Sequence, residues 1–212
     1  EHDLSNKVFL IPGGYPRLDQ NILKLNQIPY NRNKTKIVVA PTVSMREAPD
    51  CDLTYLAPFL PDLLMRLANE FPLAEIELRL HPQDISDLFA KRSCNFRHFL
   101  EEACVITEKI SNISLSVGDN GYTRSLHADI LISDTSSFAY TFFFSTGKPV
   151  IFLSPGNERI KYHDKFQKLA SIRIRDEIGV SVDSVDAAVE TCNSYLANDG
   201  KQCNDWESLR SN

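Results

Sequence analysis

The fold is decided by one stretch, Ile130-Leu131-Ile132-Ser133-Asp134-Thr135-Ser136-Ser137, in which an apolar run passes directly into a cluster of hydroxyl side chains. The first half has the length and composition of a buried strand, whereas Phe138–Ser145 after it indicates a helix. Ser, Thr and Asp are the residues that most often cap a helix N-terminus. The first N–H groups of a helix lack intrahelical partners and its dipole favours negative charge, so this junction is either an ordinary capping run or a phosphate site.

Outward from this junction, further short runs rich in Val, Ile and Leu alternate with helical segments. Nearly continuous apolar runs are typical of strands buried on both faces, as in a parallel sheet covered by helices. The alternation indicates βαβ units, whose right-handed crossovers build a Rossmann-like, doubly wound α/β fold. These further strands are expected at Val8–Ile11, Ile37–Ala40, Ile76–Leu80, Ile113–Val117 and Val150–Leu153.

Three helical segments have a clear apolar face or a clear beginning. Pro58 and Pro61 stand where proline can begin a helix, and leucines at helical spacing follow them. A late helix, Val182–Leu196, is expected to begin within a few residues of Ser181 or Asp183, which are possible caps. The leucines of the first helix are Leu60, Leu63, Leu64 and Leu67, and a second helical face combines Phe99, Ala103 and Ile106.

The composition is that of a globular protein. The 212 residues are 42% apolar and 24% charged, with a net charge of −5. An acidic chain is poorly suited to the phosphate backbone of nucleic acids, and no apolar run reaches the ~20 residues of a membrane span. We expect one domain over residues 1–197 and a polar tail over 198–212. Because the chain begins with Glu1 rather than Met, we expect a fragment of a longer protein.

The cysteines indicate a reducing compartment. There are five, an odd number, and no two have C-x-x-C spacing. This argues against both a disulfide framework and a zinc site. We therefore expect reduced thiols in a cytoplasmic protein. They are Cys51, Cys94, Cys104, Cys192 and Cys203.

Polar side chains also follow two other strands, at the carboxyl edge where open α/β sheets bind ligands. Thr42 and Arg46 come after Ile37–Ala40 and could meet phosphates, although a plain polar loop explains them equally well. Arg79 and His81 end the next strand. An imidazole there can donate to a leaving phosphate or act as a general acid, or it can be a capped structural residue.

Asp134 is unusual at an anion site. We expect this carboxylate to cap the helix, to orient a hydroxyl, or to meet a base or a cation. The sequence contains no Walker A motif and no G-x-G-x-x-G. The site is therefore neither a P-loop nor a standard NAD site.

The motifs, taken in order, resemble the CDP-glycerol glycerophosphotransferases, the family of teichoic-acid polymerases and primases. Gly14–Asp19 is similar to their G-Y-P-R-N-D segment, and Lys36–Thr42 to their lysine-strand-A-P-T segment. Leu78–Pro82 is similar to their strand that ends in His, and Ala128–Ser137, the most specific piece, to A-D-x-L-I-T-D-Y-S-S. Lys148–Phe152 resembles the K-P-hydrophobic strand that follows. Order and spacing agree from about residue 12 to about residue 155.

The resemblance implies the C-terminal, donor-binding half of a two-domain GT-B transferase. Such an enzyme moves glycerol phosphate or a sugar from a CDP- or CMP-activated donor to a surface-polymer acceptor, such as teichoic acid or capsule. By this resemblance His81, Ser136 and Ser137 hold the donor phosphates and Asp134 supports them. We predict His81 and Asp134 as catalytic. The predicted donor-binding residues are Thr42, Arg46, Arg79, Thr135, Ser136 and Ser137.

The same resemblance sets the expected partners. The N-terminal, acceptor-facing half has no counterpart in this chain. We expect no cofactor and no essential metal ion, because no D-x-D pair precedes a strand end. We expect a cytoplasmic location, and any contact with the inner face of the plasma membrane would come from regions outside this chain.

Three alternatives remain open at the level of the sequence. Leu18 stands where the family usually has Asn, and Thr135 where Tyr is common, so the donor is not fixed. The His81–Pro82 pair and the later Ser136–Ser137 pair also resemble CMP-sugar polysialyl- and capsule transferases. A non-catalytic nucleotide-binding domain and a UDP-sugar 2-epimerase are the other two candidates.

Overall fold

The computed structural model describes residues 16–27, 34–44, 56–92, 96–154 and 174–197. Within these ranges six strands form one sheet in the order β3-β2-β1-β4-β5-β6, and every neighbouring pair is parallel. The chain builds outward from β1 to β3, returns to the centre, and builds outward again from β4 to β6. This is the doubly wound, Rossmann-like α/β fold that the sequence predicts. The strands are β1 (Lys36–Ala40), β2 (Glu75–Leu78), β3 (Ile113–Leu115), β4 (Ile130–Ser133), β5 (Val150–Leu153) and β6 (Gly179–Val182).

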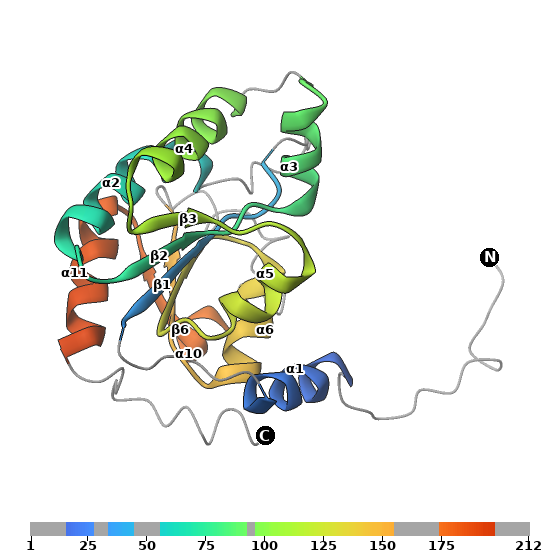
Figure 1. The fold of residues 1–212 in the computed structure, drawn as a ribbon. Coiled ribbons are helices and arrows are strands. Elements are labelled where there is room, and N and C mark those ends of the chain that lie inside the picture. Colours follow the sequence, from blue (N-terminus) through green and yellow to red (C-terminus); the bar gives the residue numbers. More distant parts are fainter. Residues whose placement is uncertain (1–15, 28–33, 45–55, 93–95, 155–173, 198–212) are drawn as a thin grey trace, which may run out of the picture.

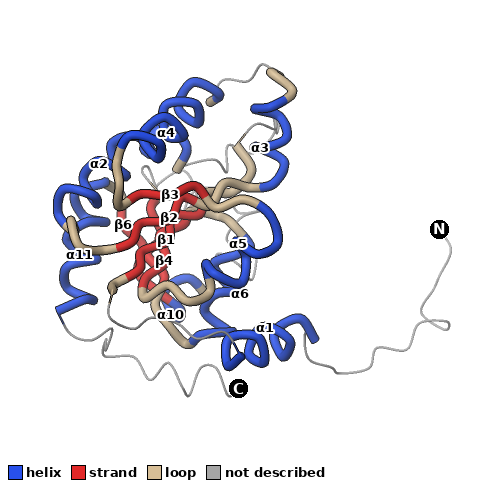
Figure 2. Tube along the Cα trace, in the orientation of Figure 1, coloured by secondary structure: helices blue, strands red, loops and turns tan. Residues whose placement is uncertain are grey.

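Helices cover both faces of the sheet. Figure 1 shows α2, α4 and α11 on one side and α1, α5, α6 and α10 on the other, and Figure 2 shows the strands enclosed between them. The described helices are α1 (Pro16–Gln27), the 3-10 turn η1 (Ala57–Phe59), α2 (Leu60–Glu70), α3 (Pro82–Phe89), α4 (Arg97–Lys109), α5 (Gly118–Ser125), α6 (Ser137–Thr146), α10 (Arg175–Ile178) and α11 (Val185–Ala197).

Alternate side chains of each strand enter two separate cores, one on each face of the sheet. In β1, Ile37 and Val39 belong to the core under α2, α4 and α11, and Val38 to the core under α6. The four leucines predicted on one helical face all lie in the first core with 0% of their surface exposed. Phe142 and Phe143 of α6 fill the second core, also at 0% exposure.

On the α6 side of the sheet, β2 contributes a buried polar side chain instead of an apolar one. This polar position was not predicted from the sequence. The strand reads E-I-E-L, so its side chains alternate rather than form a continuous apolar run, and Glu77 is buried. Glu77 forms an ion pair with Lys36 of β1 at 2.6 Å and accepts a hydrogen bond from the Ser125 hydroxyl. The Lys36 ammonium also donates to the Arg124 carbonyl at 3.2 Å. Buried charges persist only when they are paired and hydrogen-bonded, and this network provides both.

The C-terminal part of the sheet differs from expectation. β6 was not predicted, because Gly179-Val180-Ser181-Val182 is short and combines apolar with small and polar residues. The expected helix also included its last residue, Val182. The helix itself begins at Val185, within a few residues of the expected caps. The expected strand Val8–Ile11 and the expected tail over residues 198–212 lie outside the described residues.

A Cβ atom could not fit on Gly179, where β6 meets β5. Gly179 pairs with Val150, and an added Cβ would lie 1.9 Å from the Val150 carbonyl oxygen. Glycine is therefore required here for close approach of two backbones.

The described helices include none long and apolar enough to cross a membrane. Cys104 and Cys192 are free thiols, and burial raises the pKa of both, that of Cys192 to about 12. Both thiols therefore stay protonated and poorly reactive at neutral pH. The other three cysteines lie outside the described residues.

Candidate functional site

The predicted site residues lie at the carboxyl edge of the sheet, around its centre. Val39 of β1 pairs with Leu78 of β2, and Ala40 of β1 pairs with Ser133 of β4. The loops that follow these three strands therefore emerge side by side. β1 and β4 are neighbours although β2 and β3 lie between them in the chain, so the order of the sheet reverses between them. Open α/β sheets bind ligands at this switch point.

The carboxylate of Asp134 ties these loops together. Asp134 has 0% of its surface exposed and accepts hydrogen bonds from the backbone N–H groups of Thr42 at 2.8 Å, Thr135 at 2.7 Å and Leu56 at 3.2 Å. Burial raises the pKa of Asp134 to about 6, and the three N–H donors oppose that rise. The carboxylate thus joins the loop after β1, the start of η1 and the start of α6.

Arg175 of α10 holds the same junction from the other side. Its guanidinium donates to the Asp134 carbonyl at 2.9 Å and to the Ser154 hydroxyl at 3.3 Å, and lies 4.9 Å from the centre of the Phe152 ring. Arg175 is only 4% exposed, and its positive charge opposes the rise in the pKa of Asp134. Arg175 could not be predicted as a site residue, because no motif or periodicity marks a basic side chain in the short α10 as buried.

The loop after β1 is also fastened to α3. The Ser44 N–H lies 2.9 Å from both carboxylate oxygens of Asp84, a fully buried residue of α3. The Ser44 hydroxyl donates to the Thr42 carbonyl at 3.0 Å. Thr42 is therefore held between Asp134 on one side and α3 on the other, and its side chain is half-buried. Arg46, predicted four residues further on, lies outside the described residues.

Ser136 is the N-cap of α6. It has an extended backbone, with φ −62° and ψ 133°, and its hydroxyl oxygen accepts a hydrogen bond from the Phe138 N–H at 3.3 Å. Ser136 is buried, at 9% exposure. Ser137 is the first helical residue and is exposed, and its N–H precedes any intrahelical acceptor. The predicted capping role is therefore confirmed for Ser136, and Ser137 presents an exposed N–H at the helix start.

His81 is the N-cap of α3. Its Nδ1 atom accepts a hydrogen bond from the Gln83 N–H at 3.1 Å, Pro82 occupies the first helical position, and the ring is exposed. A neutral imidazole that accepts at Nδ1 carries its proton on Nε2. His81 is thus a capping residue that offers one exposed N–H donor. Its predicted catalytic role stays a prediction.

Arg79 connects the end of β2 to the start of α6. Its guanidinium carbon lies 5.0 Å from the centre of the Phe138 ring and 5.2 Å from the centre of the Tyr122 ring. Such cation–π contacts fix the position of an arginine without neutralising its charge. Because Phe138 directly follows Ser137, this positive charge stands beside the first turn of α6.

Hydrogen bonds and cation–π contacts therefore bring together most of the predicted site. They join Thr42, Asp134 and Thr135 directly, and Arg79 to the start of α6. His81 is linked to the cluster only through α3, since no polar contact joins it to Ser136 or Ser137 in the described part of the chain. The described residues contain no group of three His, Cys, Asp or Glu side chains that could hold a metal ion.

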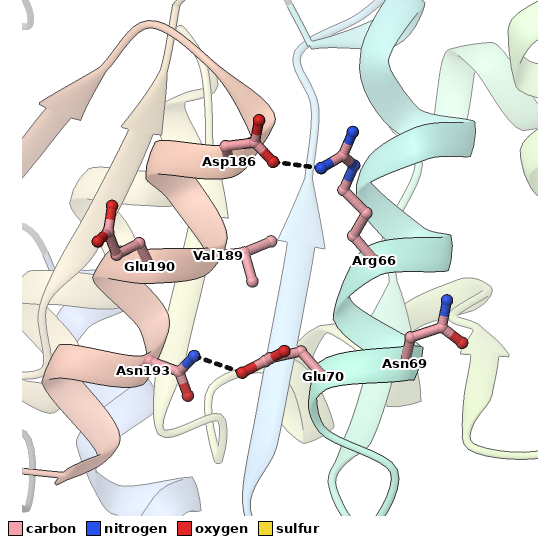
Figure 3. A pocket seen from close by; sticks show the side chains of 7 residues that line it. All are labelled: Arg66, Asn69, Glu70, Asp186, Val189, Glu190 and Asn193. Carbon is pink, nitrogen blue, oxygen red and sulfur yellow. Dashed lines mark hydrogen bonds and ion pairs between the residues drawn. The ribbon is translucent and has the colours of Figure 1, made fainter.

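A separate groove of about 470 Å³ lies between α2 and α11. Figure 3 shows that ion pairs and hydrogen bonds cross it: Arg66 contacts Asp186, and the Asn193 amide donates to Glu70 at 2.7 Å. These contacts join the outer faces of two packed helices, away from the loops that follow β1, β2 and β4. We assign the groove to helix packing.

Comparison with known proteins gives distant structural likenesses, among them two transferases. No model of a known protein family matches the chain, and no curated protein matches its sequence. The wall teichoic acid polymerase TagF is similar over 91% of this chain and 45% of its own, with a TM-score of 0.43 and 16% identity. Thermosulfurimonas dismutans KpsC, a beta Kdo 2,4 transferase, is similar over 71% of this chain and 49% of its own, with a TM-score of 0.37 and 15% identity.

The chain thus spans about half the length of each of these two structures. At this similarity neither likeness carries an argument about function. The fold assignment rests on the strand order, and the function rests on the chemistry of the site.

Proposed function

We propose that the start of α6 binds the phosphates of a cytidine-nucleotide donor, and that this chain is the donor-binding half of a GT-B transferase. The observation that carries the proposal is the junction at Ser136. There Ser136 caps an exposed helix start, the Asp134 carboxylate accepts from the Thr135 N–H directly before it, and Arg79 lies over the Phe138 ring. The motif resemblance indicates the donor class, and the donors at the start of α6 are suited to its phosphates.

The helix start offers several donors to one anion. The Ser137 N–H and hydroxyl, together with the Ser136 hydroxyl, have no competing intrahelical acceptor. The α6 dipole adds a positive partial charge, and Arg79 adds a full one. This combination of backbone donors, hydroxyls and a nearby cation suits a phosphate better than it suits a neutral ligand.

In the proposed reaction an acceptor hydroxyl attacks the activated donor. The bond between the transferred group and the leaving cytidine nucleotide breaks, the acceptor proton passes to a base, and negative charge grows on the leaving phosphate. The α6 start and the Nε2–H of His81 stabilise that charge. Asp134 acts as a positioning residue, because its oxygen atoms already accept three backbone donors. The reaction as proposed requires no metal ion.

A cytidine nucleotide leaves from both donor classes, CMP from CDP-glycerol or a CMP-sugar and CDP from a CDP-sugar. With a CDP-linked glycerol the attack is at phosphorus, and with a CMP- or CDP-linked sugar it is at the anomeric carbon. The donors at the start of α6 suit both. The acceptor, a surface polymer, would be met together with a second domain outside this chain. A protein that binds the nucleotide without turnover would share the site but would release no product.

Calorimetric titration of the purified protein with CMP, CDP, UDP and GDP tests the proposal. Ser137→Ala should weaken cytidine-nucleotide binding at least tenfold, which is about 1.4 kcal/mol. Ser111→Ala is the matched control, since Ser111 is an exposed serine before β3, at the opposite edge of the sheet. Equal affinity for all four nucleotides, or equal loss in both variants, would overturn the cytidine site. Release of CMP or CDP on adding donor and acceptor separates an enzyme from a binder.

A further inference from the structure

Arg175 places a full positive charge inside the protein, next to the segment that leads into α6. Its side chain is 4% exposed, and no carboxylate forms an ion pair with it in the described part of the chain. Its Nε atom has no hydrogen-bond partner. An arginine keeps its charge inside a protein, and a buried charge with an unused donor is costly. Hydrogen bonding alone therefore does not explain why an arginine stands at this position.

The Asp134 carboxylate is a second buried charge beside Arg175, and it has the opposite sign. The guanidinium donates to the main-chain carbonyl of Asp134 at 2.9 Å, while the carboxylate accepts from three backbone N–H groups. Burial raises the pKa of Asp134 to about 6, and among the described side chains Arg175 is the charged group that opposes this rise. Asp134 is therefore mostly ionised at neutral pH, and the two residues together carry no net charge.

The negative charge of Asp134 alone would be unfavourable for the proposed phosphate site. Asp134 comes shortly before the N-cap Ser136 and the exposed Ser137 in the chain. Charges act strongly on one another where water is excluded, so a lone carboxylate here would repel an anion and oppose the attraction of the α6 dipole. A positive charge buried beside the same residue offsets that repulsion, and salt screens buried charges only weakly.

The Arg175 side chain is also held in place by the C-terminal part of the sheet. Its guanidinium donates to the Ser154 hydroxyl at 3.3 Å and lies 4.9 Å from the centre of the Phe152 ring. Ser154 is itself fully buried, and its N–H donates to the Val182 carbonyl of β6 at 2.9 Å. The positive charge is thus fixed before any ligand binds, which is the condition under which a charge stabilises an anion most effectively.

We infer that Arg175 is a positioning residue of the donor site, whose buried charge balances that of Asp134 so that the start of α6 can accept an anionic phosphate. This inference rests on the proposed function and adds a residue to that site. Loss of the arginine charge should weaken anion binding, and loss of the carboxylate charge as well should restore it. A residue that only held the loops together would behave differently, because removing both partners would loosen the site further.

The test measures the binding of CMP and of inorganic sulfate by calorimetry at neutral pH. Arg175→Gln keeps an amide donor but loses the charge, and it should weaken both affinities about tenfold, or about 1.4 kcal/mol. Arg175→Lys keeps the charge and should stay within about threefold of the wild type. Asp134→Asn combined with Arg175→Gln should bind sulfate at least fivefold more tightly than Arg175→Gln alone. Arg124→Gln is the matched control, because it removes the same charge from an exposed residue in the last turn of α5, and it should change neither affinity.

The outcomes separate this inference from the proposed function. If CMP binds and Arg175→Gln does not weaken it, or if the combined variant gains nothing, the charge balance is wrong and the donor site stands. Equal losses in Arg175→Lys and Arg175→Gln, or in Arg124→Gln, would also overturn the inference. If sulfate follows the expected pattern but CMP does not bind, the charge balance stands and the cytidine donor is wrong. If the wild type binds neither, both are wrong.

A further variant covers the case in which Arg175→Gln does not fold. Asp134→Asn alone leaves the charge of Arg175 unopposed, so it should bind sulfate more tightly than the wild type does. If it binds sulfate no more tightly, the Asp134 carboxylate does not repel an anion at the start of α6, and the inference is wrong.

Discussion

The Asp134 carboxylate accepts a hydrogen bond from the Thr42 N–H at 2.8 Å, across the point where the strand order of the sheet reverses. This bond joins two loops that are 92 residues apart in the chain. It explains why an acidic residue stands in a segment that otherwise suits an anion. The carboxylate faces inward to backbone donors, whereas Ser137 is exposed at the start of α6.

The burial of Asp134 predicts a specific pH dependence of stability. Its pKa is raised to about 6 in the folded protein, from an ordinary value near 4 in the unfolded chain. The folded state therefore binds the proton more tightly. The contribution of Asp134 is fully present below about pH 4, is lost as the pH rises towards about 6, and is constant above that. Its size is on the order of a few kcal/mol.

Urea unfolding between pH 4 and pH 7 measures this contribution. We expect Asp134→Asn, which cannot titrate, to flatten the part of the pH profile between about 4 and 6. Asp176→Asn is the control, because Asp176 is exposed. If the free energy of unfolding of Asp134→Asn depends on pH as steeply as that of the wild type, a group other than Asp134 binds the proton.

The buried Lys36–Glu77 pair predicts strong non-additivity. Lys36→Met leaves the buried Glu77 carboxylate without its ion pair and should lower the free energy of unfolding by about 3–5 kcal/mol. Glu77→Leu leaves the buried Lys36 ammonium with only its longer ion pair to Glu75, at 3.5 Å, and should lower it by a smaller amount. The double variant should recover most of this loss, since it leaves no charge behind. Chemical denaturation of all four proteins gives the coupling energy. A double variant as unstable as the sum of the singles would contradict the prediction.

The strands at the centre of the sheet, and the loops that follow them, could be predicted from the sequence for physical reasons. Ile130–Ser133 and Val150–Leu153 are buried on both faces, so nearly every residue is apolar and the strands are easy to recognise. The position of Thr42 and Asp134 near each other follows from parallel strands alone. Their predicted roles towards a donor are not tested by the fold.

Other features depend on long-range contacts and could not be predicted. β6 is a strand because it pairs with β5, although its own residues have no strong preference. The burial of Glu77 depends on Lys36 and Ser125, which come from two other elements. Arg175 is likewise unremarkable in the sequence and becomes part of the site only when α10 packs against the Asp134 loop.

The close approach of β5 and β6 predicts that Gly179 cannot be replaced. A Cβ at this position would lie 1.9 Å from the Val150 carbonyl oxygen, and backbone on both strands would have to move. We expect Gly179→Ala to lower the free energy of unfolding by roughly 2 kcal/mol or more. Ser181→Ala, two residues along the same strand, should change it by less than about 1 kcal/mol. Thermal or chemical unfolding of the two variants measures these changes. If Gly179→Ala and Ser181→Ala are equally stable, the close contact of β5 and β6 is contradicted.

The two functions assigned to His81 can be separated by a pair of substitutions. His81→Ala removes both the cap of α3 and the Nε2–H donor, whereas His81→Asn keeps a side chain that caps helices well and replaces the Nε2–H with a shorter amide. We expect His81→Ala to lower the free energy of unfolding by about 1 kcal/mol, and His81→Asn to lower it by less. Both should slow release of the cytidine nucleotide about a hundredfold, the lower range for one lost catalytic donor. If His81→Asn reacts as fast as the wild type, His81 is a capping residue only and the leaving phosphate is stabilised by α6 without it.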